Sequence, residues 1–156
     1  MSVMDERTEV VARARRARAR EHVGNLDYLR GLLEANALGM SQSELARRFG
    51  LTQPTIYSSL RTASSVPPVR PGFSGGSPYE IAERFAAGDI DRERLVDEMV
   101  RWDYRPARPT DGLDWMTGDS GEFSETVGRA LDQGLIDDET YDEILHARAA
   151  RTAPGT

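Results

Sequence analysis

Arginines are concentrated near the start of the chain, within the run VVARARRARAREH. The run contains Arg13, Arg15, Arg16, Arg18 and Arg20. A guanidinium group binds phosphate through paired hydrogen bonds, and each phosphate that a protein neutralises makes its binding to a polyanion more sensitive to salt. Acidic residues precede the run, and its alanine and arginine content favours a helix whose dipole these charges complement. The residues therefore predict either a helix that lies along phosphates or a solvated helix or frayed arm.

The rest of the chain contains no grouping of side chains that would catalyse a reaction. His22 and His146 lie far apart in polar sequence, at no spacing that binds a metal ion. The chain has no cysteine, so it has no thiol nucleophile, disulfide or thiolate metal site. Ser74 and Ser77 have no evident histidine or aspartate partner, and the carboxylates follow the spacing of solvated helix surfaces. The sequence predicts a protein that is not an enzyme and that holds no metal ion and no cofactor.

Residues 41–63, SQSELARRFGLTQPTIYSSLRTA, have the signals of two short helices joined by a tight turn. Ser41 and Glu44 form a capping box that begins the first helix. Gly50 ends that helix, because glycine tolerates the left-handed backbone that a tight turn requires. Thr52 then caps the second helix, and a proline is acceptable in its first turn. Small and apolar residues mark the inward sides of both helices. They are Leu45, Ala46, Phe49, Ile56 and Leu60.

This segment resembles the helix-turn-helix of bacterial transcriptional regulators of the Cro/repressor and LacI-like kind. The resemblance is carried by Ala46, Gly50, Leu51, Ile56 and Leu60, together with the turn Leu-Thr-Gln-Pro-Thr. It covers about 20 residues of the chain. In that family the second helix enters the major groove of DNA with its N-terminal residues at the base edges. The alternative is a helical hairpin with an ordinary polar outer face.

The resemblance implies which residues of this chain contact DNA. The outward set is Thr52, Gln53, Pro54, Thr55, Tyr57, Ser58 and Arg61. Gln53 can pair with adenine through two hydrogen bonds, and Tyr57 can contact a thymine methyl group or a phosphate. Arg61, a turn later, suits a phosphate, as does the amide of Gln42 at the start of the first helix. A homodimer on a palindromic site is also expected from the resemblance.

Charge is distributed unevenly along the 156 residues, which suggests two functional units. Residues 1–70 carry a net charge of +4 and residues 71–156 a net charge of −10, within a total of −6. The basic residues 1–70, the front of the chain, suit binding to a polyanion. The acidic residues 71–156, the back of the chain, would be repelled by one. We expect residues 1–62 to form a basic helix-turn-helix domain and residues 78–150 an acidic helical domain. Residues 151–156 are expected to form a disordered tail.

Two further elements complete the front of the chain. A scaffold helix is expected to begin with Asn25 as its cap and to end before Gly39, covering the apolar side of the helix-turn-helix pair. Its inward stripe is Leu26, Leu29, Leu32 and Leu33, with Leu38 at its end. Residues 63–77 are rich in proline, glycine and serine and have no helical period, so they predict a linker.

The back of the chain repeats itself at a spacing of 46 residues. The matching pairs are Phe85 with Leu131, Gly88 with Gly134, Ile90 with Ile136, Asp91 with Asp137, Glu93 with Glu139 and Met99 with Leu145. Each copy has a glycine that stops one helix and an aspartate that caps the next. We therefore predict two helical hairpins. Their apolar residues are Ile81, Phe85, Ile90, Leu95 and Met99 in the first, and Val127, Leu131, Ile136, Tyr141 and Leu145 in the second.

The segment between the hairpins is rich in proline and glycine, yet it carries large apolar side chains. Trp102, Tyr104 and Trp115 either fold back onto the hairpins as core or form a surface on which a partner protein docks. Asp138 and Asp142 belong to an acidic run that is either the solvated start of a helix or a binding site for a basic protein.

Together these observations predict an all-α protein with an N-terminal helix-turn-helix domain and a C-terminal domain of two helical hairpins. We expect a sequence-specific regulator of transcription, most simply a repressor, that binds double-stranded DNA through residues 53–62. The acidic domain would serve protein interaction or regulation. The alternative is an antitoxin whose C-terminal domain neutralises a partner protein while its N-terminal domain autoregulates. No apolar run approaches the length of a membrane span, so a cytoplasmic, nucleoid-associated protein is expected.

Overall fold

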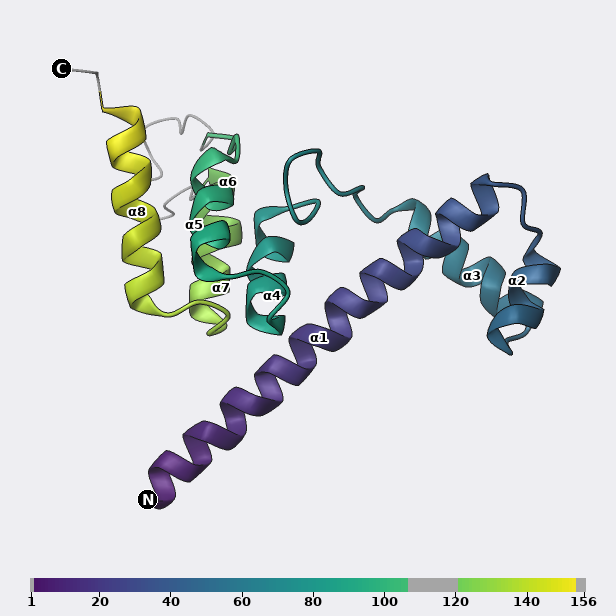
Figure 1. Ribbon diagram of the computed structural model, residues 1–156, viewed down its shortest axis with the longest axis horizontal. Coiled ribbons are helices and arrows are strands. Elements are labelled where there is room, and N and C mark those ends of the chain that lie inside the picture. The colour runs from purple at the N-terminus through teal and green to yellow at the C-terminus, as the bar shows by residue number, and fades with distance from the viewer. Residues whose placement is uncertain (1, 107–120, 154–156) are drawn as a thin grey trace, which may run out of the picture.

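The computed structural model describes residues 2–106 and 121–153. These residues form helices and no strand, which confirms the predicted all-α class (Figure 1). In chain order the elements are α1 (Val3–Ala37), α2 (Gln42–Phe49), α3 (Gln53–Ser64), α4 (Pro78–Ala87), α5 (Arg92–Arg101), α6 (Gly121–Phe123), the π-helical turn η1 (Ser124–Gly128), α7 (Arg129–Asp132) and α8 (Asp138–Thr152). None of the helices in this described part of the chain is long and apolar enough to cross a membrane.

The first helix, α1, is a single rod of 35 residues that passes both the group of α2 and α3 and the group of α4 to α8 (Figure 1). The expected start of a separate scaffold helix at Asn25 is therefore wrong, because Asn25 lies inside α1. Gly24 and Asn25 cost about 0.5–1 kcal/mol each in a helix interior. Buried residues on either side offset this cost, since Val23 packs with Ala87 of α4 and Leu32 packs in the core with α2 and α3, so the helix continues through the weak point.

The end of α1 packs with α2 and α3 around a small apolar core. Its buried residues are Leu32, Leu45, Ala46, Ile56 and Leu60. The predicted caps are present, since the hydroxyl groups of Ser41 and Thr52 each accept a backbone N–H three residues later. Gly50 ends α2 with φ +66°, a left-handed conformation that side chains disfavour. Local sequence signals therefore set the boundaries of both short helices.

Three residues expected to face this core are exposed instead: Leu33, Leu38 and Phe49. Leu33 follows the buried Leu32 and is turned about 100° away from it, off the narrow stripe that α2 and α3 cover. Leu38 lies just beyond the last turn of α1. The Phe49 ring meets only the edge of the Tyr28 ring, with centroids 5.6 Å apart. The apolar residues of α1 and α2 thus cover a wider part of each helix than the part that is buried in the front core.

Residues 65–77 connect the front and back helices and are packed at several points. The carbonyl of Pro67 accepts a hydrogen bond from Arg30 at 2.7 Å. Phe73 packs edge-on against Trp102, with ring centroids 4.9 Å apart. The connection begins two residues later than the predicted linker, because α3 continues through Ser64.

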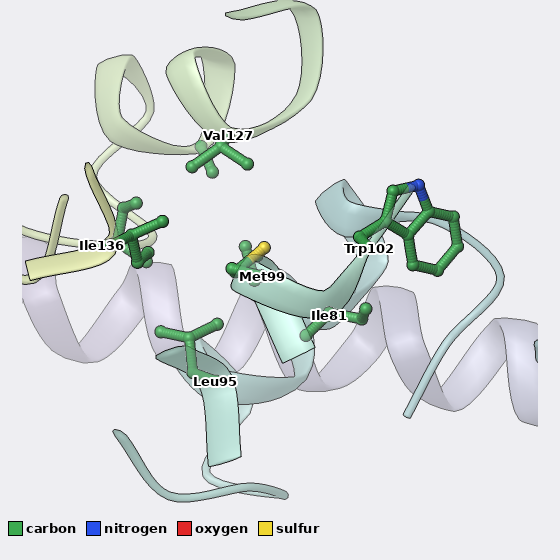
Figure 2. Close-up of a cluster of buried hydrophobic side chains, with 9 residues drawn as sticks. Ile81, Leu95, Met99, Trp102, Val127 and Ile136 are labelled. Atoms are coloured by element: carbon green, nitrogen blue, oxygen red, sulfur yellow. The ribbon is translucent and has the colours of Figure 1, made fainter. Parts of the chain in front are cut away.

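Helices α4 to α8 enclose the larger core, in which side chains from several helices converge (Figure 2). Its buried residues are Ile81, Ala82, Leu95, Met99, Trp102, Val127, Ala130, Ile136 and Ile144. The sequence repeat appears in the caps: Gly88 and Gly134 have positive φ, and Asp91 and Asp137 each accept a backbone N–H at the start of the next helix. Leu145 is exposed, contrary to expectation, because the preceding residue, Ile144, is the one that α8 buries in the core. The helix α8 continues to residue 152, so the first two residues of the expected tail are helical.

Ion pairs join α1 to the back helices across the α1–α4 contact. Arg30 on α1 donates two hydrogen bonds to the Glu80 carboxylate, at 2.7 and 2.8 Å. Arg84 on α4 donates two to Asp27 on α1, at 2.6 and 3.2 Å, and a third to Glu80 at 3.0 Å. These four residues form one network that fixes the register of α1 against α4.

Glu80 lies at the centre of this network and is only 5% exposed. Its burial alone would raise the pKa of the carboxyl group, because it penalises the charged form. Hydrogen bonds from Arg30, from the backbone N–H of Gly76 and from Arg84 outweigh that effect and hold the pKa of Glu80 below its usual range. The ionised carboxylate therefore stabilises the folded state, and this contribution is lost as the pH falls through the lowered pKa.

We predict that Glu80→Gln lowers the free energy of unfolding at pH 7 by about 3 kcal/mol, because it leaves the largely buried guanidinium group of Arg30 without its carboxylate and removes one carboxylate from Arg84, which keeps Asp27. The deficit should begin to shrink as the pH falls below about 4.3, the usual pKa of a glutamate in the unfolded chain, and should disappear only below the lowered pKa of native Glu80. Urea unfolding followed by circular dichroism across this range measures both effects. Glu44→Gln is the matched control, since its pair with Arg48 is exposed and should contribute less than about 0.5 kcal/mol. A pH-independent deficit would contradict the assignment.

Candidate nucleic-acid interface

The outer side of α3 presents three polar side chains in one line. Gln53, Tyr57 and Arg61 are four residues apart and all are exposed, whereas Ile56 and Leu60 on the opposite side are buried in the front core. The Arg61 guanidinium lies 6.0 Å from the centre of the Tyr57 ring, so these two side chains lie together. The helix thus separates an apolar side that holds the fold from a polar side that is free to make contacts.

The other residues of the expected set surround this line. Thr52, Pro54, Thr55 and Ser58 are exposed, and Gln42 is half-buried at the first position of α2. The hydroxyl groups of Thr52 and Thr55 share a hydrogen bond of 2.8 Å, and Thr52 also accepts the Thr55 N–H. These two hydroxyl groups therefore already take part in capping the start of α3. The backbone N–H groups of that first turn add a partial positive charge to the same surface.

Two exposed residues of α2 and α3 that suit contact with a nucleic acid were missed from the sequence. Thr62 lines a shallow hollow of about 350 Å³ with Tyr57, Ser58 and Arg61. Arg47, in the last turn of α2, is exposed and forms no ion pair within the described residues, in contrast to its neighbour Arg48, which pairs with a glutamate. A guanidinium at an outward position of the first helix was the signal that would have identified Arg47.

The arginines of the N-terminal run lie elsewhere. They occupy the first half of α1, whereas α3 packs near Tyr28, Leu32 and Ala35 in its second half. Arg20 donates to the carbonyl of Ala87 in α4 at 3.3 Å. Arg13 and Arg16 are exposed, and Arg15 and Arg18 face a cleft beside the back helices. The structure does not bring this run together with the outer side of α3.

The cleft lies between α1 and the α4–α7 side of the back helices and has a volume of about 830 Å³. Its guanidinium groups belong to Arg15, Arg18 and Arg129, none of which forms an ion pair within residues 2–106 and 121–153. Arg129 lies 4.4 Å from the centre of the Tyr79 ring, whose hydroxyl donates to Gln133. No sequence pattern predicted this cleft, since its two walls lie far apart along the chain.

The pKa of Tyr79 reflects the charged groups around this cleft. Its burial and the carboxylate of Glu83 raise the pKa of Tyr79 above its usual value, and Arg129 and Arg18 oppose that rise. The two arginines therefore share the surroundings of one phenol, although one belongs to α1 and the other to α7. Glu83 is itself paired with His22 on α1.

The residues expected at a protein-binding surface divide into two groups. Trp102 is buried in the back core, and Tyr104 packs against that core and donates to the Met99 carbonyl at 2.6 Å. For these two the core interpretation fits the structure. Asp138 and Asp142 are exposed near the start of α8. Trp115 lies outside the described residues.

Comparisons with protein-family models, with curated proteins and with solved structures find no match to this chain. Two surfaces are therefore the candidates for a functional role: the outer side of α3 and the arginine-lined cleft.

We predict that Gly50→Ala lowers the free energy of unfolding by about 1 kcal/mol without changing the fold. Its cost is one of backbone conformation, because φ is +66° and an added Cβ would meet no atom within 4 Å. Gly31→Ala is the matched control, since Gly31 has equal space but lies inside α1, and alanine there should raise stability by about 0.5–1 kcal/mol. Thermal unfolding of both variants measures the expected loss of stability at Gly50 and the expected gain at Gly31. Equal effects at the two positions would refute the left-handed turn.

Proposed function

We propose that this protein is a sequence-specific DNA-binding regulator of transcription, most simply a repressor. In this proposal α2 and α3 form a helix-turn-helix, and α3 reads the major groove. The observation that supports it most is the division of α3 into a buried apolar side and an exposed side that carries Gln53, Tyr57 and Arg61. In the same proposal the back helices form two hairpins that bind a protein or regulate the front.

The dimensions and chemistry of α3 fit this role. The major groove is about 12 Å wide and admits one α-helix. Gln53 lies at the first turn, where a recognition helix contacts base edges, and its amide matches the donor and acceptor of adenine. Arg61 lies two turns further along and suits a phosphate, and Arg47 adds a second exposed positive charge in the same three-helix group.

The charges of the two halves of the chain favour an orientation in which the front helices face the DNA. Residues 71–156 carry a net charge of −10, so the phosphate backbone would repel the back helices and leave the front group toward the duplex. Within the proposal, Arg13, Arg15, Arg16, Arg18 and Arg20 are secondary candidates for phosphate contact. Arg15, Arg18 and Arg20 face the back helices. A homodimer on a palindromic site and a location on the nucleoid remain part of the proposal.

The experiment is selection of bound duplexes from a random pool, followed by gel-shift titration of the selected site. We predict that Gln53→Ala weakens binding to the selected site by about 1–3 kcal/mol, with a smaller effect on unrelated duplexes. Arg61→Ala should weaken binding to all duplexes and lower the salt slope by about one. Arg151→Ala, which changes an exposed arginine in the last turn of α8 outside this surface, is the control that should bind as the native chain does. Failure of the pool to enrich any motif would reject the proposal.

A second function is favoured by the exposed acids at the start of α8. Arg92 already pairs with Glu139 and Glu143 at 3.8 and 2.8 Å, whereas Asp138 and Asp142 remain exposed. In an antitoxin these two carboxylates would contact a basic partner protein, and the front group would autoregulate.

For this alternative we predict that the full chain, used as bait, retains one basic protein in a 1:1 ratio. Asp138→Asn combined with Asp142→Asn should reduce that retention at least about tenfold. Glu125→Gln, an exposed acid of η1, is the control. Undiminished capture by the double variant would exclude α8 as the binding surface.

A further inference from the structure

The outer side of α3 changes in character along the helix. Gln53 lies in the first turn, where a recognition helix contacts base edges. The four residues that line the shallow hollow of about 350 Å³ follow over the next two turns. They are Tyr57, Ser58, Arg61 and Thr62. These residues differ in chemistry from the first turn, so the hollow is a separate contact surface on the same helix.

Three side chains of this hollow can donate hydrogen bonds to a ligand. The Arg61 guanidinium forms no ion pair within residues 2–106 and 121–153. The hydroxyl groups of Tyr57 and Ser58 donate to no other atom in the same part of the chain, and both side chains are exposed. The Thr62 hydroxyl, in contrast, already donates to the Ser58 carbonyl at 3.2 Å. The hollow therefore offers one cation and two hydroxyl donors, and Thr62 contributes only to its shape.

No carboxylate is among the four residues that line the hollow, which distinguishes it from the larger cleft. The lining of the cleft includes Glu21 and Glu83 as well as its arginines. The charge of the hollow thus favours an anion. Because the hollow is shallow, a small free anion would stay largely in water, whereas an anion carried by a larger molecule is held there by that molecule's other contacts as well. A phosphodiester group of a duplex meets both conditions.

The position of Arg61 decides between the two contacts that are open to Tyr57. The Arg61 guanidinium lies 6.0 Å from the centre of the Tyr57 ring, so one face of the ring lies toward a cation. A thymine methyl group would need an apolar ring face, whereas a phosphate oxygen needs a donor and gains from a nearby positive charge. The arrangement therefore favours an anion at the Tyr57 hydroxyl over a methyl group at the ring.

We propose that Tyr57, Ser58 and Arg61 together bind one phosphate of the DNA backbone, so that base reading by α3 is confined to its first turn. This inference rests on the proposed function, because it names what the second half of the same helix binds. Arg61 supplies the positive charge and a fork of N–H donors, and each hydroxyl group donates one hydrogen bond to a phosphate oxygen.

The length of α3 is compatible with this division. From Gln53 to Arg61 the helix rises about 12 Å, at about 1.5 Å per residue. The major groove is about 12 Å wide and is bordered by the phosphates of the two strands. A helix whose first turn lies at the base edges can therefore place the hollow at a phosphate on the border of the groove.

Neutralising single phosphates tests this contact with the full chain and the duplex selected from the random pool. Each phosphate in turn is replaced by an uncharged methylphosphonate, and binding is measured by gel-shift titration. One replacement should weaken binding of the native chain at least about tenfold and lower its salt slope by about one. Tyr57→Phe and Arg61→Ala should each bind the unmodified duplex at least about fivefold more weakly than the native chain. On the neutralised duplex both should bind within about twofold of the native chain, because the contact that they remove is already lost.

Replacing thymine by uracil, which lacks the methyl group, tests the competing contact with a base. The loss of affinity caused by Tyr57→Ala should be the same, within about twofold, on every uracil-substituted duplex. Thr62→Val is the control and should bind as the native chain does, since the Thr62 hydroxyl already donates within α3. All the substituted side chains are exposed, and Ile56 and Leu60 still hold α3 in the front core, so folding is retained.

Failure of this inference and failure of the proposed function give different results. A chain that enriches no motif from the pool rejects both. A chain that binds a motif, but whose Tyr57→Phe and Arg61→Ala variants keep their full loss of affinity on every singly neutralised duplex, rejects the phosphate contact alone. A uracil substitution that abolishes the effect of Tyr57→Ala would likewise overturn the inference, because Tyr57 would then contact a base, and it would leave the proposed function in place.

Discussion

The carboxylate of Glu80, held between Arg30 of α1 and Arg84 of its own helix, is the contact on which the arrangement of the two helix groups depends. A buried charge is tolerated only when its partners are in place, so α1 and α4 have one register in which both guanidinium groups reach it. The connecting chain is fitted to the same contact. A Cβ at Gly75 would lie 2.8 Å from the Glu80 carboxyl carbon, so the Gly-Gly pair is required by close packing and not by flexibility.

The continuity of α1 has a mechanical consequence. Leu32 near its end belongs to the core beneath α3, and Ala19 and Val23 pack with Ala87 of α4. Since no break separates these positions, anything that reorients α4 relative to α1 acts through the Glu80 network and not through a hinge. Regulation between the two groups would therefore require breaking ion pairs, which makes it a change between two discrete arrangements.

The sequence predicted the features that depend on neighbouring residues. The caps at Ser41 and Thr52 and the turn at Gly50 follow from local chemistry, and so do the glycine stops and aspartate caps of the back repeat. What failed depended on distant partners. Asn25 has the properties of a cap, but packing on both sides carries α1 through it. The outer side of α3 was predicted residue by residue, whereas the cleft was not, because Arg15 and Arg129 belong to segments that only the folded chain brings together.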